Sequence, residues 1–185
     1  MQFEYKRKIF HMLLGIAMSV MIFNIRKIYL VTFLTGIICI GIIIRLLILK
    51  GFKFRLIESF LLNFGRPMEV GMGAMNYFIG MLLSLIFPFP REYSAISVLI
   101  LGVSDGLATI IGINSRYKIY KNKTFSGTIA FFTTSYLILI IGMNSIMSSL
   151  GVSLVLTALE LFSPIDDNLL IPTAGTLLIS FVKLI

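Results

Sequence analysis

The fold is decided by residues 92–113, which read EYSAISVLILGVSDGLATIIGI. This segment is continuously apolar and lacks the alternation of a membrane-spanning strand, so we predict a helix that can cross a hydrocarbon core of roughly 30 Å. Asp105 lies about 18 Å along the helix from Tyr93, at about 1.5 Å per residue. A carboxylate at that depth costs roughly 2.5–3.5 kcal/mol on insertion scales and usually faces a polar cavity and a partner. The segment therefore predicts a membrane helix that carries a functional acid.

The rest of the chain has the same apolar character. Hydrophobic residues make up 58% of it and charged residues 13%, and its mean hydropathy is +1.01. We predict an all-α, polytopic integral membrane protein of about seven transmembrane helices, in a single domain over residues 1–185. The predicted spans are 8–25, 28–49, 71–88, 92–113, 126–143, 146–162 and 168–184. The first span could pass for a signal peptide, but no small-x-small cleavage site follows it, so we expect it to be mature structure.

Positive charge sets the predicted orientation of these spans. If the N-terminus is cytoplasmic, most Lys and Arg residues lie on the cytoplasmic side, and every acidic residue except Glu92 shares that side. The segment 51–66 mixes basic and apolar residues and is predicted to be an amphipathic helix in the membrane interface. Because both signs of charge gather at one face, we expect a polar site there.

Polar residues near the N-terminus form the first candidate group. Glu4, Lys8 and His11 share one face of a helix by their i, i+4 and i+7 spacing. The simple alternative is a positively charged anchor that only sets topology. His11 does not fit that alternative, because it is the only histidine in the chain and lies one turn inside a span.

Small residues surround the buried acid of the 92–113 segment. Ala108 and Gly112 lie on the same helical face as Asp105 and leave room for a ligand or another helix to approach. Gly102 and Gly106 match a small-xxx-small packing pattern, which accounts for the glycines but not for the acid.

The junction before the fifth span reads KTFSGT at residues 123–128. A helix that begins there presents free backbone N–H groups and a positive dipole end, which attract phosphate. Lys123 and the hydroxyls of Thr124 and Ser126 would add donors. We therefore expect an anion site, although a basic loop can also act only as a topology signal or a contact to anionic lipid.

The last candidate group precedes the final span. Glu160 is followed by Asp166, Asp167 and Asn168, and then by Pro172. Carboxylate and amide oxygens suit Mg²⁺, which is usually held by one or two carboxylates together with substrate phosphates. The alternative is that the three polar residues cap the final helix. Capping requires one such residue rather than three with an acid before them.

These motifs, taken in order, resemble the polyprenol kinase family of dolichol kinases, phytol kinases and CTP-dependent diacylglycerol kinases. The resemblance is carried by Arg7-Lys8-x-x-His11, Asp105-x-x-Ala108-x-x-x-Gly112, Lys123-Thr124-x-x-Gly127-Thr128, Glu160, Asp166-Asp167-Asn168 and Pro172. Family members transfer a phosphoryl group, typically from CTP, to the hydroxyl of a membrane lipid alcohol. The chain departs from the family at Ser126, where Glu is usual, and at Arg116, where a second Gly is common.

The resemblance implies a Mg²⁺-dependent and CTP-dependent kinase of a lipid alcohol such as a polyprenol, dolichol, geranylgeraniol or phytol. It implies an active site on the cytoplasmic face of a cell or organelle membrane, no nucleic-acid partner, and compatibility with a homo-oligomer. The implied catalytic residues are Asp105, Glu160, Asp167 and His11; nucleotide or phosphate contacts are Lys8, Arg7, Lys123, Thr124, Ser126, Gly127, Thr128 and Asn168; metal ligands are Asp105, Asp166 and Asp167.

Two other functions are open from the sequence. A cytidylyltransferase that makes a CDP-activated lipid is also a CTP-using membrane enzyme with an Asp-rich C-terminal region. Asp166-Asp167-Asn168 stands here in place of its longer Asp-Arg-x-Asp signature, which favours the kinase. A transporter or channel subunit should place polar residues through the whole membrane depth, whereas the ionisable residues here gather at one face.

Overall fold

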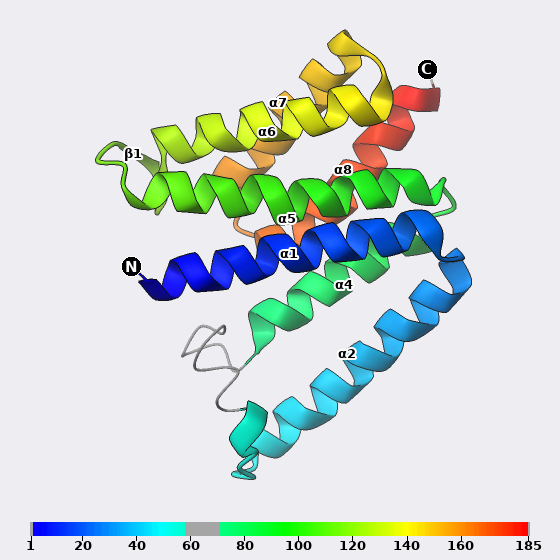
Figure 1. Ribbon diagram of the computed structural model, residues 1–185, viewed down its shortest axis with the longest axis vertical. Helices are drawn as coiled ribbons and strands as arrows, with labels where there is room; N and C mark the ends of the chain where they lie inside the picture. Colours follow the sequence, from blue (N-terminus) through cyan, green and yellow to red (C-terminus); the bar gives the residue numbers. More distant parts are fainter. Residues whose placement is uncertain (1, 58–70, 185) are drawn as a thin grey trace.

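The computed structural model describes residues 2–57 and 71–184. Over these ranges it consists of helices and one short antiparallel hairpin (Figure 1). The elements are α1 (Gln2–Asn24), α2 (Lys27–Leu49), α4 (Met72–Ile86), α5 (Arg91–Ile113), β1 (Lys118–Tyr120), β2 (Lys123–Thr124), α6 (Phe125–Met143), α7 (Ile146–Phe162) and α8 (Asp167–Leu184). The all-helical prediction is confirmed for this part of the chain.

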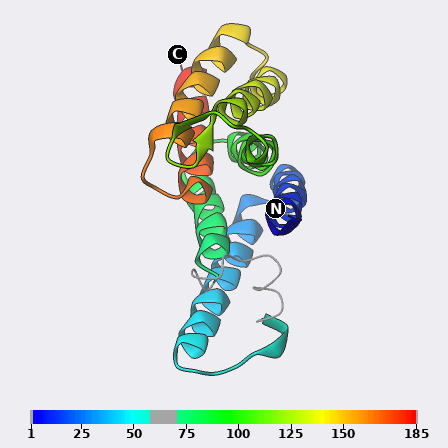
Figure 2. The ribbon, with the colours of Figure 1, turned by 90° about the vertical axis from the view of Figure 1, so that its left-hand side faces the viewer.

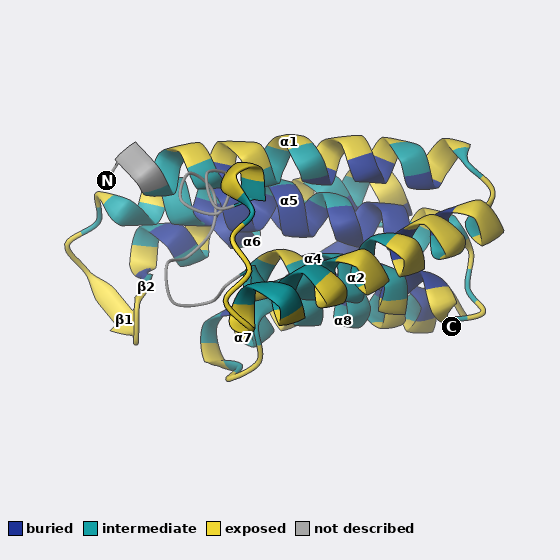
Figure 3. Ribbon diagram, turned by 90° about the horizontal axis from the view of Figure 1, so that it is seen from below, coloured by how far each residue is buried: buried dark blue, intermediate teal, exposed yellow. Residues whose placement is uncertain are grey.

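Helix α5 is the centre of the bundle. It packs against α1, α6 and α8, and Figure 3 shows that it carries more buried surface than its neighbours. Glycines permit this close packing: a Cβ added at Gly15 of α1 would lie 2.6 Å from Gly102 Cα, and one added at Gly127 of α6 would lie 3.5 Å from Gly112 Cα. A Cβ added at Gly106 would collide with the Met12 side chain of α1, so the predicted packing role of Gly102 and Gly106 is confirmed.

Five of the helices are long and apolar enough to cross a membrane, namely α1, α2, α5, α6 and α8. Helices α4 and α7 have 15 and 17 residues. At about 1.5 Å per residue they are shorter than a hydrocarbon core of roughly 30 Å. The chain is thus a helical protein with several potential membrane spans, and the number of crossings stays a prediction.

The first and third predicted spans have different bounds in the structure. Helix α1 begins at Gln2 rather than near residue 8, because its first turns are stabilised by an ion pair between Arg7 and Glu4 at 2.7 Å and because Lys8 is buried. Helix α4 ends at Ile86, before the proline-containing turn that leads into α5. Most of the predicted interfacial helix at 51–66 lies outside the described residues, which stop at residue 57 on that side.

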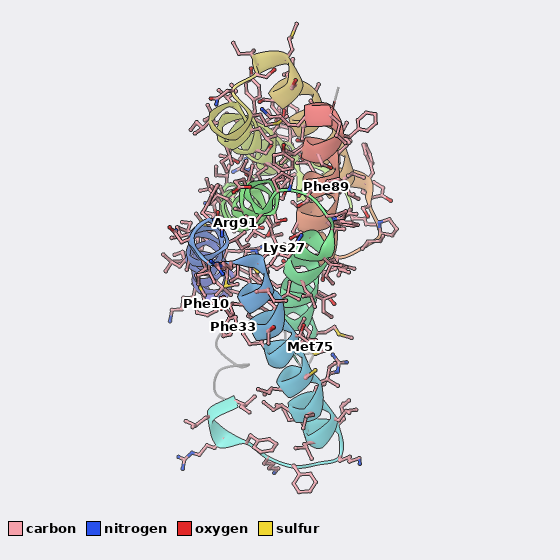
Figure 4. All side chains as sticks on the ribbon, turned by 90° about the vertical axis from the view of Figure 1, so that its right-hand side faces the viewer. Phe10, Lys27, Phe33, Met75, Phe89 and Arg91 are labelled. Carbon is pink, nitrogen blue, oxygen red and sulfur yellow. The ribbon has the colours of Figure 1, made fainter. Side chains whose placement is uncertain are left out.

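Basic side chains donate hydrogen bonds to carbonyl groups at the helix ends that lie away from the N-terminus of α1. Lys27 donates to the carbonyl of Phe87, Arg91 donates to Ile25 O at 2.7 Å, and Lys183 donates to Met143 O at 2.8 Å. Figure 4 shows Lys27 and Arg91 where α2 and α5 begin. These cations satisfy carbonyls that helix ends leave unpaired. Helix α2 packs against α4 and leans away from the other helices (Figures 1 and 2). Only Leu30 and Leu34 of this helix are buried.

Candidate functional site

A cluster of buried and half-buried ion pairs lies at the end of the bundle that carries the N-terminus and the hairpin. Lys8 of α1 donates to Asp105 of α5. Lys123 of β2 donates to Glu160 of α7 at 2.5 Å and to Asp167 of α8 at 2.7 Å. The five residues come from five elements that are far apart in the sequence, so only the tertiary fold brings them together.

Three acids of this cluster could hold one metal ion. One carboxylate oxygen from each of Asp105, Glu160 and Asp167 lies within 4.8 Å of the others. The Asp105 and Glu160 residues are only 4% and 3% exposed. Lys8 and Lys123 supply two positive charges against three negative ones, which leaves one formal negative charge in a largely buried site. Buried charge without compensation is costly, so the cluster favours an additional cation.

An unpaired oxygen supports the same conclusion. Glu160 uses Oε1 to accept from Lys123, while its Oε2 is buried without a hydrogen-bond partner among the described residues. Buried polar atoms are paired in the large majority of cases, and exceptions often mark a functional role. Carboxylate oxygens are the ligands that Mg²⁺ prefers. The donor set at this site therefore fits a hard divalent cation.

Lys123 stays charged at neutral pH. Burial by itself lowers the pKa of its ammonium group, but the Asp167 and Glu160 carboxylates outweigh burial and raise this pKa above its ordinary value of 10.5. Its side chain remains 30% exposed, so the cation can also reach a ligand that arrives from water. The lysine thus holds two acids together and offers a fixed positive charge.

A cavity of about 360 Å³ opens beside the cluster. Its polar side is formed by the five cluster residues and by Arg7, His11, Ser163, Asp166 and Asn168. Its apolar side is formed by Phe10 and Leu14 of α1 and by Ala74, Tyr77 and Phe78 of α4. The volume lies in the range of about 300–1,000 Å³ that is common for ligand pockets. A ligand with a charged part and an apolar part matches both sides.

The predicted KTFSGT junction lies beside a second, smaller cavity of about 140 Å³. Thr124 is the N-cap of α6, and its hydroxyl accepts from Gly127 N at 3.3 Å. Thr128 donates its hydroxyl to Thr124 O at 3.1 Å. Thr124, Gly127 and Thr128 line this cavity together with Lys123 and Glu160, which also line the large one. Thr124 therefore begins α6, and the Lys123–Glu160 ion pair lines both cavities.

The other predicted site residues make separate contacts outside the ion-pair cluster. Asp166 accepts from Asn168 N through Oδ1 at 2.9 Å and caps α8, while the Asn168 side chain donates to Gly73 O at 3.2 Å. Both residues and Arg7 line the large cavity, with Arg7 paired to Glu4. The Ser126 hydroxyl is buried without a partner among the described residues, and it is not part of either cavity wall. Asp166 as a metal ligand and Ser126 as a phosphate contact stay predictions.

His11 and Tyr77 join α1 to α4 beside the cluster. Their ring centroids are 4.5 Å apart in an edge arrangement, and His11 Nε2 lies 3.7 Å from Asp105 Oδ2. Sequence reasoning selected His11 but missed Tyr77 and the other α4 residues of the cavity. The only available signal was a tyrosine within an apolar span, which ordinarily reports packing or an interface position rather than a site.

Comparisons with known proteins identify a relative but no described activity. No family model matches the chain, and no solved structure matches it. The chain is 36% identical over 177 residues to Uncharacterized protein MJ1137 of Methanocaldococcus jannaschii, and the match covers 91% of this chain and 88% of that protein. The chain belongs to the family of that archaeal protein. The match extends over nearly the whole length of both chains.

Proposed function

We propose that the protein is a membrane kinase that phosphorylates the hydroxyl of a lipid alcohol with CTP and Mg²⁺. The observation that carries the proposal is the convergence of Asp105, Glu160 and Asp167 with Lys8 and Lys123 beside one cavity that also has an apolar side. Phosphoryl transfer requires charge neutralisation and alignment rather than covalent work by the protein. The cluster would neutralise charge, and the cavity with its polar and apolar sides would align the two substrates.

Asp105, Glu160 and Asp167 are the residues that would hold Mg²⁺, and the ion would neutralise the phosphate oxygens of a bound nucleotide. Lys123 would contact the same phosphates from the hairpin side, because it keeps its charge and remains partly exposed. Thr124, Gly127 and Thr128 would add donors at the start of α6 through the smaller cavity. Lys8 would hold the Asp105 carboxylate in position.

The reaction forms a bond between the alcohol oxygen and the γ-phosphorus and breaks the bond between that phosphorus and the β–γ bridging oxygen. CDP leaves with the electron pair of the broken bond. The hydroxyl proton goes to His11 Nε2, which is buried and has no hydrogen-bond partner among the described residues. A histidine that carries its proton on Nδ1 offers a lone pair at Nε2, which suits a general base.

The position of the site suits substrates from two phases. The N-terminus and the hairpin lie at the same end of the bundle (Figure 1), and the cluster includes Lys8 near the first of these and Lys123 of the hairpin. A nucleotide arrives from water, whereas a lipid alcohol keeps its tail among acyl chains. Because the positive-inside rule favours a cytoplasmic position for this end, we propose a multi-pass enzyme with a cytoplasmic active site.

The experiment is a nucleotide-by-lipid activity matrix on purified protein in nanodiscs with Mg²⁺. CTP labelled at the γ-phosphate is supplied with geranylgeraniol, phytol, a polyprenol or diacylglycerol in turn. Label in the lipid supports the kinase, while label in pyrophosphate indicates a cytidylyltransferase. Absence of label from both products, with every alcohol and every common nucleoside triphosphate, rejects the proposal.

The variant Asp105→Asn tests whether the cluster performs the reaction. We expect it to lower the rate of lipid phosphorylation by at least about 10²-fold, because it removes a buried charge that would face the phosphates. The matched control is Glu92→Gln, since the Glu92 side chain is 49% exposed in the first turn of the same helix. If both variants phosphorylated the lipid at the same rate, Asp105 would have no role in catalysis.

A further inference from the structure

Unpaired polar atoms gather around the large cavity. In the described part of the chain, six buried side-chain nitrogen or oxygen atoms have no hydrogen-bond partner. Three of them, His11 Nε2, Tyr77 Oη and Glu160 Oε2, belong to residues of this one cavity wall. Unpaired buried atoms are uncommon because each one loses its hydrogen bond to water on folding. Their concentration at one cavity indicates a ligand that completes their hydrogen bonds.

Tyr77 is the most informative of the three. The residue is 2% exposed, it contacts the His11 ring, and its hydroxyl lies next to the crossing of α1 and α5. A Cβ added at Gly15 would lie only 3.0 Å from Tyr77 Oη, so the glycine provides the space in which this hydroxyl sits. A phenylalanine would fill the same space without an unpaired donor. The hydroxyl therefore gives packing no evident benefit.

The wall around Tyr77 differs from the ionic side of the cavity. Phe10, Leu14, Ala74 and Phe78 form an apolar surface from α1 and α4. His11 stands between this surface and Asp105, with Nε2 at 3.7 Å from Asp105 Oδ2. An amphiphile can thus place its tail against α1 and α4 while its polar end meets His11 and Tyr77, with the carboxylate cluster directly beyond.

We propose that Tyr77 and His11 form the subsite that binds the acceptor hydroxyl, and that the apolar wall of α1 and α4 receives the first part of the lipid tail. Tyr77 Oη donates to the hydroxyl oxygen, and the hydroxyl donates its own hydrogen to His11 Nε2. The ligand class is an alcohol on a long aliphatic chain, since the wall is apolar. This assignment rests on the proposed kinase function but concerns binding, which can be measured without catalysis.

The first test measures binding in nanodiscs without nucleotide. Geranylgeraniol is compared with geranylgeranyl acetate, which has the same tail and no hydroxyl. We expect the alcohol to raise the Tm of the wild-type protein more than the ester does, and the variant Tyr77→Phe to lose this difference. The matched control is Ser149→Ala, which also removes a buried unpaired hydroxyl but lies outside both cavities. It should keep the wild-type preference.

The second test separates positioning from structural damage. In the labelled-CTP assay, Tyr77→Phe should raise the KM for geranylgeraniol about tenfold, the effect of losing about 1.4 kcal/mol of binding, and leave the KM for CTP unchanged. Its Tm without ligand should equal or exceed that of the wild type, because the variant removes an unpaired donor. A second variant, Ala74→Leu, enlarges an exposed wall residue and should weaken binding of the long alcohol more than that of a short one.

The outcomes distinguish this inference from the function proposed above. If the wild type prefers the alcohol and Tyr77→Phe does not, the subsite is supported even where no phosphoryl transfer is found. Equal stabilisation of the wild type by alcohol and ester would overturn it. An unchanged KM for the alcohol in Tyr77→Phe, together with active phosphorylation, would overturn it while leaving the kinase proposal intact.

Discussion

Lys123 should be the residue on which the stability of the site depends most. The variant Lys123→Met removes the ammonium that binds Glu160 at 2.5 Å and Asp167 at 2.7 Å and leaves both acids in place. The ligand oxygens lie within 4.8 Å of one another, and two unit charges at that distance repel by roughly 3.5 kcal/mol at an effective dielectric constant near 20. Removing one partner of a buried pair costs about 3–5 kcal/mol. Because the Lys123 side chain is 30% exposed, we expect a value near the lower end, about 3 kcal/mol.

The assay is reversible denaturant unfolding of the protein in detergent micelles at pH 7 without divalent cations. The control is Lys121→Met, two residues away on the exposed hairpin, where the ammonium only lies over the Tyr120 ring at 5.2 Å from its centroid. It should cost under about 1 kcal/mol. If the two variants differ by less than about 1 kcal/mol, the cluster does not contribute to stability as the geometry requires.

The same variant has a defined pH dependence. The neighbouring acids raise the pKa of Lys123 above 10.5, so the stabilising contribution of the ammonium is complete below pH 10.5 and is lost only as the pH rises through the higher folded-state value. The stability difference between wild type and Lys123→Met should therefore be constant from pH 7 to pH 9. A decline within that interval would show that the ammonium loses its proton in the folded protein.

Two further predictions follow from the packing and from the acids. Gly15→Ala places a Cβ 2.6 Å from Gly102 Cα and should lower the free energy of unfolding by about 1–3 kcal/mol, because it separates α1 from α5. The control Gly151→Ala meets nothing within 4 Å and should be neutral or stabilising. Thermal unfolding of both variants in nanodiscs measures the difference. Mg²⁺ should raise the Tm of the wild-type protein, and the rise should be much smaller in Glu160→Gln, since this variant loses a charged ligand. Equal Tm shifts in the two proteins would exclude Glu160 as a ligand.

Element type and approximate position could be predicted from the sequence. Long apolar runs without alternation leave the helix as the simplest structure that pairs all backbone groups within a membrane, so the seven predicted segments correspond to seven helices of the described chain. Helix ends were less predictable, because α1 continues through charged residues whose burial depends on α5. The hairpin at β1 and β2 was not predicted, since its short strands are polar and exposed.

The candidate site could be predicted only in part. Asp105, Lys123, Glu160 and Asp167 were selected because ionisable residues in or beside apolar spans are costly and need partners. The sequence could not assign those partners: Lys8 binds Asp105, while Lys123 binds the other two acids. Among the three consecutive polar residues before α8, it could not separate Asp167, which joins the cluster, from Asp166, which caps the helix.

By itself, the sequence determined that the chain is a bundle of apolar helices and that most of its charged residues lie outside or near the ends of those helices, because hydropathy and charge are local properties of the residues. Only the tertiary structure decided which charges meet, that Glu160 retains an unpaired oxygen, and that Tyr77 belongs to the cavity. Those features depend on how helices cross, and the crossings are set by close contacts such as Gly15 against Gly102. Contacts between residues so distant in the chain leave no periodic pattern in the sequence.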